Sequence, residues 1–279
     1  MFRLDGKVAI ICGGASGIGE ASARAMAGLG ATIVIADVDE GRSESIVAEL
    51  AEAGGSATAM TTDIMSEASI GALMAGVAET YGRIDILHNS AGIPRSIAPD
   101  TEVAEMLLEW WNMTLAGHVT GSMLSCKYAI PHMIAAGGGS IINTSSMAAF
   151  AATINQAAYS VAKAGLHALS REVAATYGRN NIRCNTIVPG AVLTPRGKAT
   201  MTEEMFMLFA SETPVPYVPS PQDLGNVVAF LAGDGSRALN AQDLMVNGGL
   251  GITLPFWQYK MSRRDGEQFA ASAPKYDAD

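Results

Sequence analysis

The chain has 279 residues, of which 49% are hydrophobic and 16% charged, and its formal net charge is -9 at pH 7. This composition excludes a disordered chain, and the length suits one large α/β domain. The negative charge argues against a nucleic-acid-binding or anionic-membrane-binding surface, since both need clustered Lys and Arg. Small molecules are therefore the expected partners.

The cysteines predict a reducing environment. Cys12, Cys126 and Cys184 are odd in number, far apart and embedded in apolar stretches, which indicates buried free thiols. Free thiols fit the cytoplasm. The first seven residues contain no apolar region of signal-peptide length, so we expect a cytoplasmic protein.

One uncharged stretch needs a separate interpretation. No Asp, Glu, Lys or Arg occurs between Lys127 and Lys163, which could be mistaken for a membrane span. Pro131 and the glycines at 137–139 interrupt it, so it predicts a buried strand with flanking helices.

The first predicted element ends in a glycine-rich turn. Residues 7–12 are apolar and predict a strand, which stops at Gly13-Gly14-Ala15-Ser16-Gly17-Ile18-Gly19, and the Ala-rich residues 20–29 predict a helix. Strand, glycine turn and helix together present backbone N–H groups and the positive helix end to a phosphate. The spacing is G-x-x-x-G-x-G, so the prediction of a nucleotide site depends on this context.

The second strand is predicted at 31–36 and ends at Asp37. A carboxylate at this place can bind the two ribose hydroxyls of a dinucleotide and would repel a 2′-phosphate, which favours NAD over NADP. The alternative is a solvated turn carboxylate, since Asp39 and Glu40 follow closely.

The rest of the chain alternates between helices and strands. The predicted elements are a helix at 42–53, a strand at 56–60 ending near Asp63, a helix at 66–81, a strand at 84–88, a mostly helical stretch at 102–135 with breaks near Gly117 and Pro131, a strand at 140–144, a helix at 157–168 and a strand at 182–188. This alternation predicts an α/β fold, a single Rossmann-type doubly wound parallel sheet with helices on both faces and right-handed crossovers. Asp37, Asp63, Asn89, Ser146 and Pro189-Gly190 all fall at carboxyl ends of strands, where such sheets bind ligands.

Tyr159 and Lys163 are the candidate proton-transfer pair. On a helix, positions i and i+4 share a face, so the phenol and the ammonium would point into the same space. A nearby cation favours the phenolate and moves its pKa toward the working pH. Taken alone, a Tyr and a Lys four residues apart are usually just neighbours.

At this point the sequence resembles the short-chain dehydrogenase/reductase family, in its single-domain NAD-dependent form. The likeness covers residues 3 to 251, and it rests on motifs in the family's order and spacing: Gly13-x-x-x-Gly17-x-Gly19, Asn89-Ser90-Ala91-Gly92, Ser146, Tyr159-x-x-x-Lys163, Pro189-Gly190-x-x-x-Thr194 and Val246-Asn247-Gly248-Gly249. We therefore expect one dinucleotide-binding and catalytic domain over 1–251 and a carboxyl-terminal extension over 252–279.

The resemblance implies a role for each matching residue. Tyr159 would be the acid or base, Lys163 would lower its pKa and hold the nicotinamide ribose, and Ser146 would bind the substrate oxygen, with Ser145 the near miss. The residues implied to contact NAD, besides Tyr159 and Lys163, are Gly13, Ser16, Gly17, Ile18, Gly19, Asp37, Asp63, Ile64, Asn89, Ala91, Gly92, Pro189, Gly190, Val192 and Thr194. The implied reaction interconverts a secondary alcohol and a ketone and needs no metal.

Three positions depart from the family pattern. Cys12 replaces a Thr before the glycine turn, and Ser90 replaces the second Asn of Asn-Asn-Ala-Gly. His118 stands where the family often has a fourth catalytic residue, an Asn whose backbone carbonyl holds a water in a proton relay. We hypothesise that His118 keeps a local helix distortion there and adds a titratable group to the relay. The alternative is a histidine that only fills the space.

The substrate side is less specific. Met147, Phe150, Asn155 and Gln156 are candidate wall residues, and the Met-rich residues 196–217 are a candidate lid or an ordinary packed helix. They suggest an apolar secondary alcohol or ketone with some polar decoration, a cyclic compound being one candidate.

Four further expectations concern assembly and the remaining groups. A homodimer or homotetramer is the default assembly for the family. The aromatic part of the tail, residues 255–259, should pack on the protein, with the last ten or so residues loosely held. His88, His132 and His167, which lack metal-ligand spacing, are assigned to structure.

Two other functions remain as alternatives. An NADP-dependent carbonyl reductase would need a basic residue near the adenine ribose, where this chain has Asp37. A non-catalytic NAD(H)-binding regulator would lack Tyr159 or Lys163, and both are present.

Overall fold

The structure, a computed structural model, describes residues 3–94, 96–254 and 256–265. Within these ranges seven strands form one sheet in the order β3-β2-β1-β4-β5-β6-β7, and all neighbouring strands are parallel. The strands are β1 (Val8–Cys12), β2 (Thr32–Asp37), β3 (Ser56–Thr61), β4 (Ile86–Asn89), β5 (Gly139–Thr144), β6 (Ile182–Pro189) and β7 (Asp243–Val246). The predicted doubly wound sheet is confirmed, and its strand order reverses between β1 and β4, where such sheets bind ligands.

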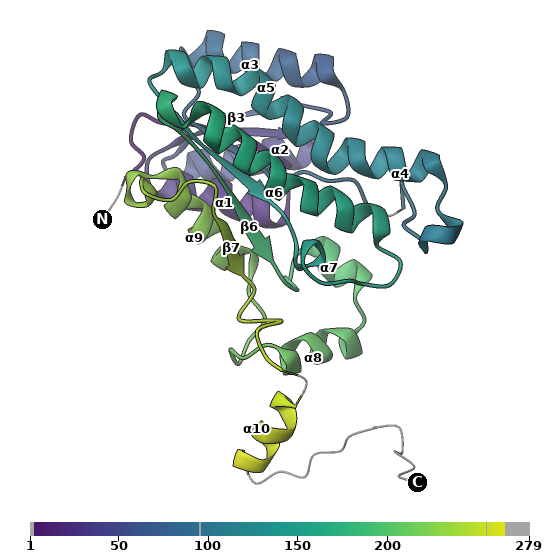
Figure 1. Ribbon diagram of the computed structural model, residues 1–279. Helices are drawn as coiled ribbons and strands as arrows, with labels where there is room; N and C mark the ends of the chain where they lie inside the picture. Colours follow the sequence, from purple (N-terminus) through teal and green to yellow (C-terminus); the bar gives the residue numbers. More distant parts are fainter. Residues whose placement is uncertain (1–2, 95, 255, 266–279) are drawn as a thin grey trace, which may run out of the picture.

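Helices cover both faces of the sheet (Figure 1). The helices are α1 (Gly17–Gly28), α2 (Glu40–Glu52), α3 (Glu67–Tyr81), α4 (Leu108–Leu115), α5 (Gly121–Ala135), α6 (Ala157–Tyr177), α7 (Pro195–Thr200), α8 (Glu203–Glu212), α9 (Pro221–Ala232) and α10 (Trp257–Asp265). Buried side chains of α3, α5 and α6 pack on one face, and those of α1, α2 and α9 pack on the other.

Alternation along each strand produces these two cores. In β1, Ile10 belongs to the core under α3, α5 and α6, whereas Ile11 belongs to the core under α1, α2 and α9. Successive side chains of a strand point to opposite faces, so a strand covered on both sides is apolar throughout. The carboxyl ends of the strands are thereby held in one row.

The helical stretch before β5 contains a π-helix. A π-helix, η2 (Ala116–Thr120), joins α4 to α5 and includes His118, and the backbone N–H of Gly121 donates to Ala116 O. The break expected near Gly117 is therefore a π turn. The break expected at Pro131 is wrong, because Pro131 lies inside α5. Burial of Ala129, Ile130 and Met133 around it compensates the one backbone hydrogen bond that proline removes.

The tail begins with a short helix beside α8. Figure 1 shows α10 standing away from the sheet, next to α8. The Gln258 side chain donates hydrogen bonds to Ser211, at 3.3 Å, and to Glu212, while Phe256 and Tyr259 are about half exposed. The expectation for residues 266–279 lies outside the described residues. No helix in the described part of the chain has the length and apolar character needed to cross a membrane.

Candidate active site

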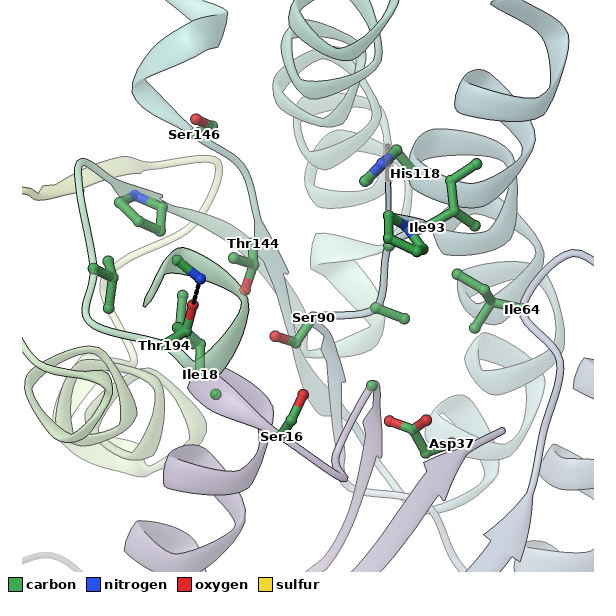
Figure 2. Close-up of a pocket in the computed structure, with 18 of the residues that line it drawn as sticks. Ser16, Ile18, Asp37, Ile64, Ser90, Ile93, His118, Thr144, Ser146 and Thr194 are labelled. Atoms are coloured by element: carbon green, nitrogen blue, oxygen red, sulfur yellow. Dashed lines mark hydrogen bonds between the residues drawn. The ribbon is translucent and has the colours of Figure 1, made fainter. Parts of the chain in front are cut away.

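A cavity of about 660 Å³ lies at the carboxyl ends of the strands. Most of the residues that the sequence singled out line it: Gly13, Ser16, Gly17, Ile18, Asp37, Asp63, Ile64, Ala91, Gly92, His118, Ser146, Tyr159, Lys163, Pro189, Gly190, Val192 and Thr194. Figure 2 shows Ser16 and Asp37 on one side of this cavity and Ser146 on the opposite side. The arrangement suits an extended ligand.

Two candidate cofactor residues are buried behind the cavity wall. Gly19 lies in the first turn of α1 and packs against the backbone of Gly13. The side-chain amide of Asn89 donates a 2.9 Å hydrogen bond to Asn143 Oδ1 within the sheet. Both therefore support the wall from behind in this structure.

The four candidate substrate residues lie outside the lining of this cavity. Asn155 and Gln156 line a second, shallower cavity of about 380 Å³ beside the start of α6. Phe150 is half exposed, and Met147 Sδ accepts a hydrogen bond from Asn247.

The structure adds wall residues that no motif indicated. They come from the segment after β4, from the end of β5 and from the residue after α7: Ile93, Pro94, Ile97, Thr144 and Met201. Thr144 could have been found because it ends a predicted strand. The apolar side chains Ile93 and Ile97 come from a loop without a sequence signal.

The glycine turn is built for close backbone approach. Gly13 has φ 82°, and a Cβ there would lie 2.6 Å from Ala91 Cα, so only glycine fits. The structure starts α1 at Gly17, three residues before the predicted start, and the side chain of its N-cap, Ser16, makes no capping hydrogen bond. The first N–H groups of α1 are thus left for a ligand, and the turn fits a dinucleotide pyrophosphate.

Asp37 ends β2 beside this turn. Its Oδ2 accepts a 3.1 Å hydrogen bond from Ala15 N, and its Oδ1 accepts one of 3.2 Å from Asp39 N. The carboxylate lines the cavity and also holds the glycine turn. It fits a ribose diol as an acceptor and disfavours a second anion at the same place.

Tyr159 and Lys163 come from α6 and meet at the cavity. Lys163 is 5% exposed, its Nζ lies 5.6 Å from the centroid of the Tyr159 ring, and it donates a 2.8 Å hydrogen bond to Thr144 O. A cation held near a phenol stabilises the phenolate. The pair therefore has the geometry of a proton donor and its electrostatic partner.

Ser146 follows β5 on the same wall. Its Oγ accepts a 3.2 Å hydrogen bond from Ala148 N, which leaves the hydroxyl hydrogen for a ligand. Ser145 also lines the cavity, but its Oγ is engaged on α6 by Lys163 O and His167 Nε2. The hydroxyl hydrogen that can serve a ligand is thus that of Ser146.

His118 stands against both the tyrosine and the turn after β4. Its ring is edge-on to Tyr159, with 5.1 Å between centroids and an interplanar angle of 87°. A Cβ at Gly92 would collide with this ring. The Ser122 hydroxyl donates a 3.1 Å hydrogen bond to His118 O.

Titratable groups behind the cavity are held neutral by burial. His88 Nε2 lies 2.9 Å from Thr144 Oγ1, and burial lowers the pKa of His88 to about 3. Burial raises the pKa of Cys12 to about 11 and that of Cys184 to about 12. All three cysteines are free and buried, as predicted. The described residues contain no cluster of three or more His, Cys, Asp or Glu suited to a metal.

Comparisons with known proteins agree with this geometry. A family model described as enoyl-(acyl carrier protein) reductase matches residues 13–251. D-threitol dehydrogenase of Mycolicibacterium smegmatis is 38% identical over 251 residues, covering 90% of this chain and 95% of that protein. Cis-4-hydroxycyclohexanecarboxylate dehydrogenase of Sinomonas cyclohexanicum is 37% identical over 243 residues, which cover 87% of this chain and 96% of that protein. A structure of 7α-hydroxysteroid dehydrogenase complexed with NADH and 7-oxo glycochenodeoxycholic acid is similar, with a TM-score of 0.84 and 34% identity. The match covers 88% of this chain and 95% of that one.

Proposed function

Because the chain belongs to the short-chain dehydrogenase/reductase family, we propose that it is an NAD-dependent oxidoreductase that interconverts a secondary alcohol and a ketone. The observation that carries the proposal is the convergence of Tyr159, Lys163 and Ser146 on one cavity whose other side is the glycine turn. Acid–base groups and a dinucleotide cradle are both needed for hydride transfer to or from a carbonyl carbon.

The residues divide the reaction between them. Bound along the glycine turn, NAD would supply the hydride acceptor, and its reduced form the donor. The Ser146 hydroxyl donates to the substrate oxygen and orients it. The Tyr159 phenol gives its proton to that oxygen in ketone reduction, and the Tyr159 phenolate takes the proton from the alcohol in oxidation, while the Lys163 ammonium stabilises the phenolate.

Charge at the adenine end supports NAD over NADP. Asp37 places a carboxylate where a 2′-phosphate would sit. The first basic side chain after it, Arg42, is already held by Glu20 Oε1 at 2.6 Å and Glu49 Oε1 at 3.2 Å. No cation in this part of the described chain is thus placed to offset a phosphate.

The walls and the relatives together suggest the substrate class. Ile93, Ile97 and Met201 give apolar sides to the cavity that Tyr159 and Lys163 also line. Relatives named for a hydroxycyclohexane acid and a hydroxysteroid act on ring alcohols, whereas D-threitol is acyclic. We propose an apolar, ring-borne secondary alcohol as the substrate.

His118 is proposed to take part through Tyr159. The π-helix that carries it is the helix distortion expected from the sequence, and the imidazole meets the Tyr159 ring directly. An imidazole at this place adds a titratable group to the surroundings of the phenol.

A homo-oligomer is proposed on the evidence of exposed apolar side chains. Leu108, Met123, Ile134 and Val161 are each at least 39% exposed on α4, α5 and α6. Light scattering at several concentrations tests this, and a monomer at all of them would contradict it.

The test of the function is a screen of cyclic and acyclic secondary alcohols with NAD and with NADP, following the absorbance of the reduced cofactor. Tyr159→Phe is the control, and its turnover is expected to fall by about 10²-fold to 10⁴-fold while NADH still binds. Turnover with NADP alone would support a carbonyl reductase instead. NADH binding without turnover of any alcohol or ketone would favour a non-catalytic regulator.

A further inference from the structure

A set of three polar side chains lies behind the active site, in which Ser145 and His167 are buried and Asp243 is exposed. Ser145 Oγ is 2.8 Å from His167 Nε2, and His167 Nδ1 is 2.7 Å from Asp243 Oδ1. Ser145 follows β5, His167 lies on α6, and Asp243 begins β7. The set of three side chains therefore connects three elements, and β6 lies between β5 and β7, the two strands that it joins.

This set of side chains contacts the backbone of Lys163, the proposed partner of Tyr159. The Ser145 hydroxyl donates a 3.0 Å hydrogen bond to Lys163 O, while Lys163 Nζ donates to Thr144 O. The end of β5 and the middle of α6 are thus joined by two hydrogen bonds in opposite directions. These bonds set the distance between two groups. One is Ser146, which follows Ser145, and the other is Tyr159, one turn before Lys163 on α6.

Counting donors shows why the histidine is needed. Ser145 has one hydroxyl hydrogen, and when this hydrogen goes to Lys163 O the Ser145 oxygen can only accept, from an N–H at His167 Nε2. His167 Nδ1 lies 2.7 Å from Asp243 Oδ1, so the ring serves both contacts at once when each of its nitrogens carries a hydrogen, and the Asp243 carboxylate then orients the ring. Without the imidazole, the Ser145 hydroxyl loses the partner that aims its hydrogen.

A nucleophilic role for this Ser, His and Asp set does not fit the geometry. Ser145 is 3% exposed, and its oxygen is engaged on α6. A substrate in the main cavity would meet Ser146 instead.

We propose that His167 is a positioning residue for the oxidoreductase reaction. Held by Asp243, it aligns Ser145 on Lys163 O and so keeps Ser146 at the working distance from Tyr159. The sequence alone assigns His167 to structure. Phe150 packs edge-on against the imidazole, with 4.8 Å between the ring centroids. This inference rests on the proposed function.

The test compares His167→Leu with His167→Gln, whose amide keeps an N–H donor for Ser145, and with His132→Leu on α5 as the matched control. We expect His167→Leu to lower kcat roughly tenfold, because small misplacements of reacting groups are costly, with the Kd for NADH unchanged. His167→Gln should recover most of this loss, and His132→Leu should show none. Backbone hydrogen exchange over residues 140–148 should rise only in His167→Leu.

Each outcome separates this inference from the proposed function. A parent protein without alcohol or ketone turnover overturns the function, whereas an active parent with His167→Leu at the same kcat and the same exchange overturns the positioning role alone. A lower melting temperature with an unchanged kcat would also overturn it. If His167→Leu does not fold, Asp243→Ala on the edge strand replaces it, with a smaller fall in kcat expected and an unchanged kcat counting against the proposal.

Discussion

The carboxylate of Asp100 accepts a 2.8 Å hydrogen bond from the backbone N–H of Tyr159, although 59 residues separate the two in the chain. Its other oxygen accepts from Ala158 N at 3.1 Å. Asp100 is 3% exposed, and Gln156, the residue at the N-cap position of α6, makes no side-chain capping bond. Asp100 therefore caps the helix that carries Tyr159, the proposed acid–base residue, from the loop that lines the cavity.

Loss of this cap should affect both stability and catalysis. Asp100→Ala is expected to cost about 1 kcal/mol of unfolding free energy, as cap deletions do, and to lower kcat, because the first turn of α6 carries Tyr159. The matched control is Asp223→Ala, which removes a capping-box residue of α9 away from the cavity. Denaturant unfolding and steady-state kinetics measure the two effects. An equal fall in kcat for both variants would contradict a specific role for Asp100.

Cofactor preference should depend on the charge of Asp37. Asp37→Asn keeps an acceptor for Ala15 N and removes the negative charge that opposes a 2′-phosphate. The ratio of kcat/KM for NADP to that for NAD should rise by about tenfold or more, corresponding to about 1.4 kcal/mol. Asp39→Asn, two residues later, provides the control. An unchanged ratio in Asp37→Asn would assign the preference to another group.

The pH dependence of turnover should include the ionisation of His118. The pH profile of kcat/KM is expected to lose one ionisation in His118→Asn, because the titratable ring against Tyr159 is removed. His118→Phe retains a ring in that space without an ionisable group and should show the same loss. Profiles that superimpose on that of the parent would contradict the hypothesis that His118 adds a titratable group to the proton relay.

Acid should destabilise the fold through His88. The buried imidazole stays neutral in the folded protein down to about pH 3, whereas in the unfolded chain it takes up a proton below 6.5. The unfolded state then binds more protons, so the stability from neutral His88 is complete above pH 6.5 and falls as the pH drops toward 3. Between pH 7 and 5 the loss should be about 2 kcal/mol at 1.36 kcal/mol per pKa unit. Urea unfolding of His88→Gln should show this part of the pH dependence removed, and an equal loss in both proteins would refute the assignment.

The sequence predicted the parts of the site that depend on local pattern. Runs of β-branched residues bounded by glycine or polar residues placed the strand ends, so Asp37, Ser146 and Gly190 were expected at one edge of the sheet, where they lie. The Pro131 break was wrong because tertiary packing of α5 outweighs the local cost of proline.

Contacts between distant segments had no sequence signal. Asp100 contacts the start of α6, and His167 contacts Asp243, only after the sheet has formed. The same holds for Ile97, which reaches the cavity from a loop. Such contacts depend on how loops and helices pack on the sheet, and neither periodicity nor motif spacing records that packing.

The π turn at Ala116–Thr120 makes the number of residues in this segment a determinant of the geometry of the candidate site. A π turn holds one residue more than the α-helical turn it replaces, and each residue advances a helix by about 100°. A chain shortened by one residue here would form a regular helix without a broken bond. Its α5 would then present a different face to the sheet, or α4 and His118 would rotate away from Tyr159. Single-residue deletions in this short segment should therefore be far less tolerated than substitutions, and a family alignment without gaps at 116–120 would reflect helix phase instead of side-chain chemistry.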